Sequence, residues 1–362
     1  MKPILFLVAG SLAFGQAPAP EISFDSAPNY FKLPPDLYLG EASGVAVNSK
    51  GHIFIFSRGN STGPAYGATA AQLLEFSPDG KYLREIGHNL YAWSFAHAVR
   101  VDPEDNIWAV DKGSDMIIEF NPEGRVKMVF GRKKEASDEG ATAWTHVTPR
   151  RPAIDGEFRQ PTDVTWDPAG DIFISDGYIN SRVAKFDKNG RWVKQWGTFG
   201  KEPGQFNTPH SIAADAKGNI YVADRGNSRI QVFNPNGDFE REIRIRVPVP
   251  PDVVPWMGPK PPADAVGTQG PGAPWAICIT PGPTQYLYSA DAYPGRIYKM
   301  TLDGKVLGVL GTSGRQLKEF GWIHEMACPS ENTLFVAEIL NWRVQKLTLH
   351  PSRTESTPTA NR

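Results

Sequence analysis

The feature that most constrains the fold of this chain is an internal repeat. Six segments align with one another: residues 41–60, 95–120, 160–186, 205–233, 273–300 and 321–347. Each copy reads as a short apolar strand, a turn such as "DAKGN", a second strand, a polar loop and a third apolar strand, and several copies add a fourth. A sheet this small cannot bury both faces alone, so the units must stack on their neighbours. The repeat therefore predicts an all-β fold, namely a six-bladed β-propeller.

The segments outside the repeats are expected to complete the last blade and to form loops on the ring. We expect the propeller to occupy residues 16–350, with "EISFDSAPNYFKLP" supplying the outer strand of the last blade. Two insertions, residues 131–157 and the Pro-rich stretch 246–274, interrupt the blade spacing and are predicted to be loops on one rim. They either shape a site or are merely tolerated excursions.

The two ends of the chain differ in composition from the repeats. Residues 1–15 contain Lys2, an apolar run and small residues before Gln16, a pattern typical of a secretory signal peptide cleaved near Gly15. The alternative is an uncleaved membrane anchor, although the run is short for a stable span. We expect a secreted or periplasmic protein with no stable membrane insertion after cleavage, and a disordered tail over residues 351–362.

Composition narrows the possible partners. The net charge of -1 leaves no basic excess for binding nucleic acid, and 40% hydrophobic residues suit a soluble globular protein, which we expect to be a monomer. Cys278 and Cys328 are the only cysteines, so no disulfide framework holds the chain. They could pair, but both lie in apolar strand-like segments, and we expect buried free thiols.

Histidine recurs at one position of the repeat. The residue before the first strand of each copy is, in order, Ser43, His97, Thr162, His210, Trp275 and His324. The first strand of a propeller blade is the innermost, so these side chains are predicted to face the central channel. One such histidine alone would be structural, but three from alternate blades, converging with a fourth position open, form the ligand set of a catalytic zinc site. The other histidines, His52, His88, His146 and His350, match no common position and are expected on the surface or in loops.

The ends of the second strands are expected to lie at the same mouth of the channel. They carry Ser57, Asp111, Asp176, Asp224, Asp291 and Glu338. Most of these carboxylates are predicted to accept turn N–H groups. Arg58 and Tyr178 are less easily explained as structural. An arginine can hold a carboxylate through two hydrogen bonds, and a tyrosine beside a metal and a cation can lose its proton and act as a base.

Several motifs carry a family resemblance. The blades resemble NHL repeats, and "SDGYINSR", "GQFNTPHSIA" and "VADRGNSRIQVF", together with the three histidines, resemble peptidylglycine alpha-amidating lyase, formally peptidyl-alpha-hydroxyglycine alpha-amidating lyase. The resemblance covers nearly the whole mature chain. It implies that His97, His210 and His324 bind zinc, that Tyr178 is the base, and that Arg58 and Arg225 face the substrate. The implied reaction cleaves a C-terminal alpha-hydroxyglycine into a peptide amide and glyoxylate.

The resemblance also implies a calcium site and shows where this chain departs from the family. The backbone carbonyls of Val45 and Val99 and the carboxylate of Glu325 map to the calcium ligands, with glutamate in place of the family's aspartate. Trp322 replaces a methionine and could reshape the substrate pocket. Ile179 replaces a cysteine and removes a disulfide.

Three functions remain open at this point. The leading hypothesis is a zinc lyase acting on peptide alpha-hydroxyglycine ends or on a related carbinolamide. The same metal site could instead hydrolyse a lactone or an ester, because zinc polarises either substrate. A noncatalytic NHL propeller that binds a peptide, a glycan or a protein partner is the third.

Overall fold

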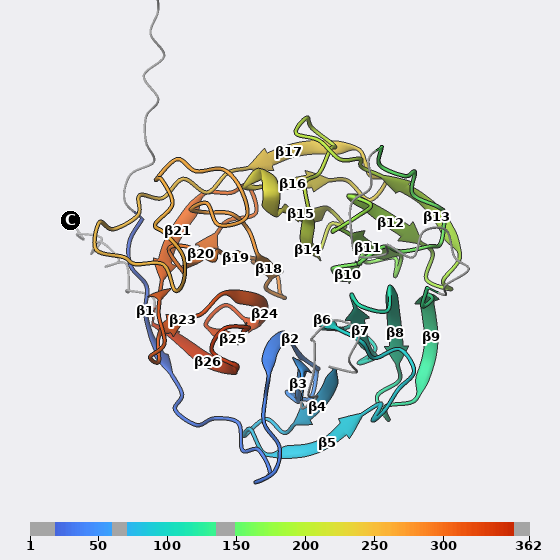
Figure 1. Cartoon of the computed structure of the whole chain (residues 1–362), viewed down its shortest axis with the longest axis horizontal. Coiled ribbons are helices and arrows are strands. Elements are labelled where there is room, and N and C mark those ends of the chain that lie inside the picture. The colour runs from blue at the N-terminus through green and yellow to red at the C-terminus, as the bar shows by residue number, and fades with distance from the viewer. Residues whose placement is uncertain (1–18, 60–70, 135–148, 351–362) are drawn as a thin grey trace, which may run out of the picture.

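The strands form a ring of six four-stranded antiparallel sheets (Figure 1). This computed structural model describes residues 19–59, 71–134 and 149–350. The predicted all-β six-bladed propeller is confirmed. The expected signal peptide and C-terminal tail lie outside the described residues. No helix in the described ranges is long and apolar enough to cross a membrane.

Each blade is built mainly from one repeat. Blade 1 contains β2 (Glu41–Val47), β3 (Ile53–Arg58), β4 (Gln72–Phe76) and β5 (Tyr82–Ile86). Blade 2 contains β6 (Ala96–Val101), β7 (Ile107–Asp111), β8 (Met116–Phe120) and β9 (Val126–Gly131). Blade 3 contains β10 (Asp163–Trp166), β11 (Ile172–Asp176), β12 (Arg182–Phe186) and β13 (Trp192–Trp196).

The second half of the ring follows the same order. Blade 4 contains β14 (Pro209–Ala214), β15 (Ile220–Asp224), β16 (Arg229–Phe233) and β17 (Phe239–Ile243), with the short 3-10 helix η1 (Arg225–Asn227) after β15. Blade 5 contains β18 (Ala276–Ile279), β19 (Leu287–Ala290), β20 (Ile297–Met300) and β21 (Val306–Leu310). Blade 6 contains β24 (Ile323–Ser330), β25 (Thr333–Glu338), β26 (Arg343–His350) and β1 (Ser23–Ser26). The short strands β22 (Thr312–Ser313) and β23 (Glu319–Phe320) pair in parallel between blades 5 and 6.

The N-terminal strand closes the ring, as the sequence predicted. Strand β1 pairs antiparallel with β26, with Ser23 opposite His350 and Ser26 opposite Leu347. The last blade therefore combines the two ends of the described chain. Phe24 of β1 is buried in the same cluster as Leu347 and Leu349.

The hydrophobic core is divided among the contacts between neighbouring blades. One cluster joins Val110 and Ile117 of blade 2 to Val164 and Ile174 of blade 3. Middle strands such as β11 are buried along their whole length, whereas the outer strand β13 is mostly exposed. Each blade thus covers the apolar faces of its neighbours, which is why the repeat predicts a closed ring.

Bulges in the innermost strands change the predicted place of the channel residues. Pairing with the second strand shifts by one residue between Ala96 and Ala98, and the skipped residue is His97. The same shift skips Ser43, His210 and His324. These four residues lie inside the first strands and not before them, as the sequence had suggested, while Thr162 and Trp275 do precede β10 and β18. A bulge residue leaves the ladder and can aim its side chain in a new direction.

The two cysteines are paired in the structure. Cys278 of β18 and Cys328 of β24 form a disulfide with a Cα–Cα distance of 6.1 Å. The expectation of free thiols was wrong, because the innermost strands of blades 5 and 6 are neighbours and bring the cysteines together.

The Pro-rich insertion, residues 246–274, forms a loop without strands, as the sequence predicted. It reaches the loop after β25, where Trp256 Nε1 donates to Asn341 Oδ1 at 3.1 Å. The centre of the other insertion, residues 135–148, lies outside the described residues.

Candidate metal centre

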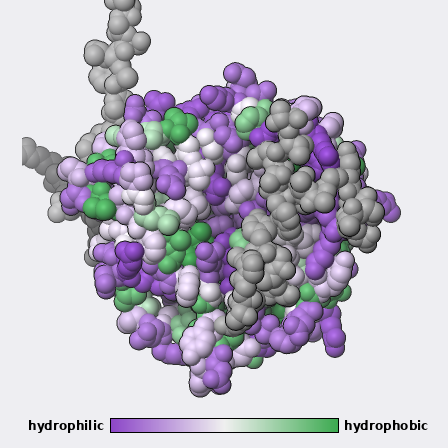
Figure 2. Space-filling model, in the orientation of Figure 1, coloured by the Kyte–Doolittle hydropathy of each residue, from purple (hydrophilic) through white to green (hydrophobic). Residues whose placement is uncertain are grey.

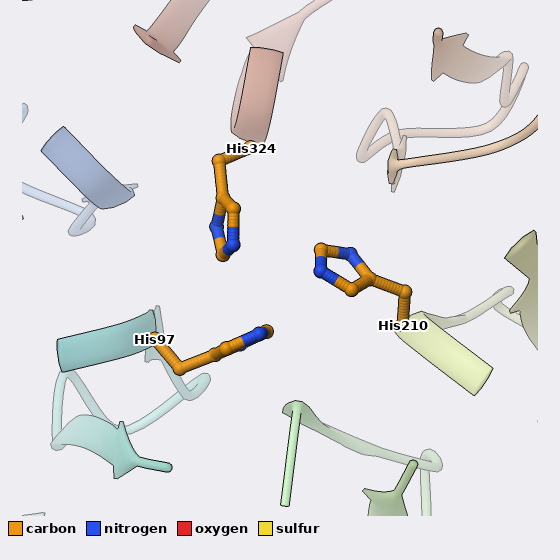
Figure 3. A group of neighbouring side chains, drawn as sticks. All are labelled: His97, His210 and His324. Carbon is orange, nitrogen blue, oxygen red and sulfur yellow. The ribbon is translucent and has the colours of Figure 1, made fainter. Parts of the chain in front are cut away.

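Three histidines from alternate blades converge at the centre of the ring (Figure 3). His97, His210 and His324 lie on β6, β14 and β24, and all three side chains are buried. Each offers one ring nitrogen, and these nitrogens lie within 4.8 Å of one another. The described residues therefore contain a group able to hold a metal ion.

Each histidine is oriented by a backbone carbonyl of the next blade. His97 Nδ1 lies 2.6 Å from Thr162 O and His210 Nδ1 lies 2.6 Å from Trp275 O. His324 Nδ1 lies 2.8 Å from Ser43 O. A carbonyl only accepts, so each Nδ1 carries the proton and each Nε2 keeps a free lone pair for a metal.

The electrostatic surroundings keep these imidazoles neutral. Burial lowers the pKa of all three histidines well below the ordinary 6.5, and nearby cations lower it further. Neutral imidazole is the form that binds metals. Geometry, tautomer and charge state thus all fit a metal ion bound through three Nε2 atoms.

Tyr178 points its hydroxyl at the same point. Its phenol oxygen lies 3.3 Å from His97 Nε2 and 3.1 Å from His210 Nε2. Burial by itself would raise the pKa of Tyr178, but Arg225, Lys112 and Arg58 outweigh it, and the pKa is lower than 10.0. The loop after β11 thus places a hydroxyl with a lowered pKa beside the candidate ligands.

Arg58 and Arg225 flank Tyr178, as the sequence suggested. Arg58 Nε donates to Ala96 O at 3.0 Å, and its guanidinium also pairs with Glu41. Arg225 is buried, is hydrogen-bonded to Tyr178, and stacks 4.4 Å from the ring centroid of Trp275. Its Nε has no hydrogen-bond partner among the described residues and is a candidate contact for a substrate anion.

Lys112 is a third cation that sequence reasoning missed. Its Nζ lies 3.6 Å from the ring centroid of Tyr178. Lys112 follows the strand-end residue Asp111, as Arg225 follows Asp224 and Arg58 follows Ser57. Reading that one repeat position across all blades would have found it.

The carboxylates at the strand ends have the predicted structural role. Asp111 accepts hydrogen bonds from the backbone N–H groups of Phe95 and Ser114. Asp291 accepts from Gly272 and Arg296, and burial raises its pKa to about 6. These residues hold the loops of the mouth and do not join the histidine group.

Among the residues implied as calcium ligands, Glu325 has its carboxylate engaged by groups of the protein. Glu325 Oε2 accepts the backbone N–H groups of Val45 and Val99 at 2.9 and 3.0 Å. Its other oxygen lies 3.0 Å from Nε of Arg100. The carboxylate is also tightly enclosed, since a Cβ added at Gly44 would lie 2.7 Å from Oε2.

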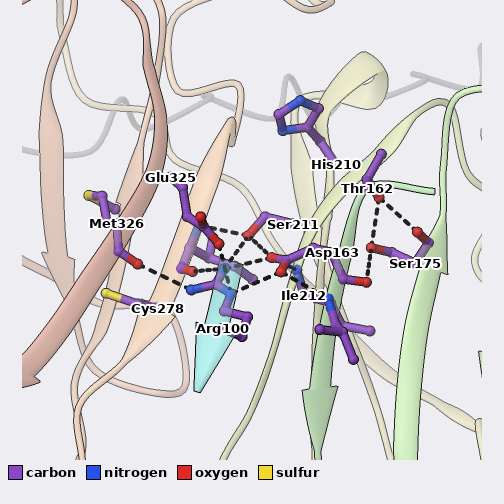
Figure 4. Close-up of polar contacts among 12 residues, drawn as sticks. Arg100, Thr162, Asp163, Ser175, His210, Ser211, Ile212, Cys278, Glu325 and Met326 are labelled. Carbon is purple, nitrogen blue, oxygen red and sulfur yellow. Dashed lines mark hydrogen bonds and ion pairs between the residues drawn. The ribbon is translucent and has the colours of Figure 1, made fainter. Parts of the chain in front are cut away.

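A guanidinium occupies the centre of this region instead (Figure 4). Arg100 pairs with Asp163 through two hydrogen bonds of 2.9 and 2.6 Å, and it also donates to Ser211 Oγ at 3.2 Å. It reaches the carbonyls of Met326 and Ile277 as well. Arg100 therefore connects the innermost strands of blades 2 to 6, and Glu325 extends the network to blade 1. Arg100 thus places a positive charge beside the carboxylate that the resemblance assigns to calcium.

Comparisons with known proteins agree with the repeat and the resemblance. The NHL repeat model matches residues 206–233. The chain is 31% identical over 239 residues to the peptidyl-glycine alpha-amidating monooxygenase of Mus musculus, a match covering 58% of this chain and 22% of that protein. It is 25% identical over 339 residues to peptidyl-alpha-hydroxyglycine alpha-amidating lyase 1 of Drosophila melanogaster, covering 85% of this chain and 57% of that protein.

The matches cover only part of each relative. The chain spans less than two thirds of the length of either relative. Among solved structures, one described as a streptogramin B lyase aligns with a TM-score of 0.54 at 13% identity, over 91% of this chain and 98% of that one. That likeness concerns the fold alone. The resemblance seen in the sequence is confirmed by homologues named as amidating lyases, by the NHL repeat and by the six-bladed fold.

Proposed function

We propose that this protein is a zinc-dependent lyase that cleaves a peptidyl-alpha-hydroxyglycine, or a related carbinolamide, into an amide and glyoxylate. The observation that carries the proposal is the contact of the Tyr178 hydroxyl with Nε2 of both His97 and His210. It brings a potential base to the edge where a metal would bind. The relatives named as amidating lyases support the same reaction.

The three histidines would hold the zinc ion through Nε2. Zinc, when bound there, acts as a Lewis acid that polarises an oxygen of the substrate. The carbonyls of Thr162, Trp275 and Ser43 keep the ligand rings in the required tautomer.

The protein side chains would move the protons and hold the substrate. Tyr178 accepts the proton of the substrate's alpha-hydroxyl group. The electron pair of that O–H bond forms the carbonyl of glyoxylate, the carbon–nitrogen bond breaks, and the departing nitrogen takes up a proton to give the amide. Arg225 and Arg58 bind the substrate carboxylate and favour the ionised tyrosine. A buried guanidinium with an unused Nε is suited to that anion.

The proposal includes where the protein works. The expected signal peptide at residues 1–15 would export it to the periplasm or the medium. The Cys278–Cys328 disulfide supports an oxidising compartment. Mass determination of the N-terminus of the mature protein tests this, and an intact Met1 would contradict it.

Glyoxylate release is the direct test of function. Untagged protein is analysed for metal and then incubated with alpha-hydroxyhippurate, with glyoxylate measured over time. We expect about one zinc per chain and zinc-dependent glyoxylate formation. Full zinc with no glyoxylate would reject the lyase, and hydrolysis of a lactone or ester in its place would identify the other metal-assisted reaction. A metal content far below one per chain would favour a noncatalytic binding propeller.

A further inference from the structure

The mouth around the three histidines is divided by polarity. The residue after each strand-end side chain is, in blade order, Arg58, Lys112, Gly177, Arg225, Ala292 and Ile339. Cations therefore come from blades 1, 2 and 4, while blades 5 and 6 supply apolar side chains. A substrate bound at the centre meets opposite chemistry on its two sides.

The apolar side is a separate cluster beside the metal centre. Trp275, Ala292 and Ile339 are buried together, and the half-buried Trp322 and Leu340 pack on them. The Trp275 ring lies 5.1 Å from Trp322 and 5.6 Å from His210, centroid to centroid. In Figure 2 apolar side chains lie beside the central depression, on the side of blades 5 and 6. We call Trp275, Trp322, Ile339 and Leu340 the aromatic wall.

We propose that the aromatic wall binds the acyl group on the hydroxyglycine nitrogen and selects substrates in which that group is aromatic or bulky and apolar. The identity of the substrate rests on the proposed function, but the presence of an apolar subsite does not. An alpha-hydroxyglycine carries its carboxylate and its acylated nitrogen on the same carbon. With the carboxylate on the cationic side, the acylated nitrogen can direct its acyl group toward the apolar side.

Arg225 and Trp275 connect the two sides. The guanidinium of Arg225 stacks 4.4 Å from the Trp275 ring, and its Nε is a buried donor with no hydrogen-bond partner among the described residues. A carboxylate at that Nε leaves the substrate running along Trp275 toward Trp322. An acyl group bound beside the carboxylate would therefore contact the aromatic wall.

The wall is fixed in place by the surrounding loops. Trp275 Nε1 donates to Thr268 O at 2.6 Å, so the Pro-rich insertion holds this ring. The loop after β25 is tied to Trp322 by the hydrogen bond from Ile339 N to Trp322 O at 3.2 Å. Trp322 has a φ of 55°, which is uncommon for a bulky side chain. Gln160 and Thr208 have the same conformation at the equivalent positions of blades 3 and 4, so three of the six blades share this backbone, and only blade 6 places an indole on it.

Binding of unreactive acylglycines tests the wall without any lyase activity. Calorimetry compares N-benzoylglycine with N-acetylglycine on zinc-loaded wild type, Trp322→Ala and Trp192→Ala. We expect wild type to bind the benzoyl compound about 10-fold more tightly, and Trp322→Ala to lose most of that preference while binding the acetyl compound normally. Trp192 is a half-buried tryptophan on the outer strand β13, so its variant is the matched control.

The outcomes separate the wall from the reaction. Equal affinity of wild type for both acylglycines, or no binding of either, would overturn the wall. A benzoyl preference that depends on Trp322, together with no cleavage of any alpha-hydroxyglycine, would reject the lyase and keep the subsite. If Trp322→Ala fails to fold by circular dichroism, Leu340→Ala takes its place with the same expected loss of preference. If the lyase is active, the ratio of kcat/KM for the N-benzoyl substrate to that for the N-acetyl substrate should fall in Trp322→Ala by about as much as the binding preference does.

Discussion

His324 Nδ1 lies 2.8 Å from the carbonyl oxygen of Ser43, a residue 281 positions away in the chain. This contact joins the innermost strand of the last blade to that of the first, and β1 joins the same two ends of the chain at the outer edge of blade 6. The orientation of one candidate metal ligand therefore depends on closure of the ring. A metal bound by all three histidines would in turn stabilise the closed ring, because it binds only the folded chain.

Removing any one candidate ligand should lower metal affinity sharply. His97→Ala, His210→Ala or His324→Ala leaves two of three ring nitrogens, and zinc content after dialysis is expected to fall from about one per chain to a small fraction of that. His88→Ala is the control, because that side chain is 70% exposed and pairs with Glu85. Elemental analysis measures both, and equal losses would contradict the assignment.

Tyr178→Phe separates chemistry from metal binding. The phenol oxygen is not one of the three ligand atoms, so zinc content should stay normal. Loss of the proton acceptor should lower kcat by roughly 100-fold to 10,000-fold. Steady-state glyoxylate formation measures this, and near-normal turnover would remove tyrosine from the proposed mechanism.

Arg58→Ala should impair both binding and turnover while sparing the metal. Its guanidinium contributes positive charge near Tyr178 and lies 3.9 Å from the ring centroid of Phe95. We expect a raised KM and a lowered kcat in the same variant, because the cation both holds the substrate and favours the ionised tyrosine. A change in KM alone would limit Arg58 to substrate binding.

Arg100→Met should destabilise the protein without involving calcium. The substitution leaves Asp163 and Glu325 buried without their cation, a change expected to reduce the free energy of unfolding by about 3 to 5 kcal/mol. Arg244→Met is the control, since its pair with Glu242 is about one third exposed and should contribute less than about 1 kcal/mol. Urea titrations compare the variants. Wild type should keep the same Tm with calcium or with a chelator, and a Tm raised by calcium would show that the implied site exists.

Asp115 predicts a pH dependence of stability. Burial raises its pKa to about 8, so between about pH 4 and pH 8 the folded state binds a proton that the unfolded state lacks. Stability from this group therefore rises as the pH falls through 8, by about 1 to 2 kcal/mol between pH 8.5 and pH 6.5. Asp115→Asn keeps an acceptor for the Gln160 N–H and should reduce this difference in unfolding free energy. An unchanged difference would mean that Asp115 is ionised in the folded state at pH 7.

The sequence predicted those features that recur in every blade. Strand, turn and alternating side chains reappear six times, and the position of the histidines in alternate copies places them on alternate blades. Tyr178 and Arg58 could be recognised because they depart from the repeat. Lys112 could have been recognised by comparing its repeat position across the blades, because Arg58 and Arg225 stand at the same position.

Features that depend on contacts between blades were not predictable in this way. The pairing of Cys278 with Cys328 follows from the approach of two innermost strands, which no local pattern reports. Arg100 looks like an ordinary strand residue, and its role depends on Asp163 and Glu325 arriving from other blades. The bulge that turns His97 inward is a shift in pairing and leaves no mark in hydrophobic alternation.

The alternation of histidines with backbone carbonyls that accept their Nδ1–H hydrogen bonds gives the ring a functional unit of two blades. One blade contributes an imidazole, and the next contributes the backbone oxygen that orients it, at Thr162, Trp275 and Ser43. Duplicating or deleting a single blade would place two histidine blades, or two carbonyl-contributing blades, next to each other. The alternation that orients each imidazole would then be lost. Recombination between such genes, or the design of larger rings around the same ion, should therefore succeed only when blades are exchanged in pairs.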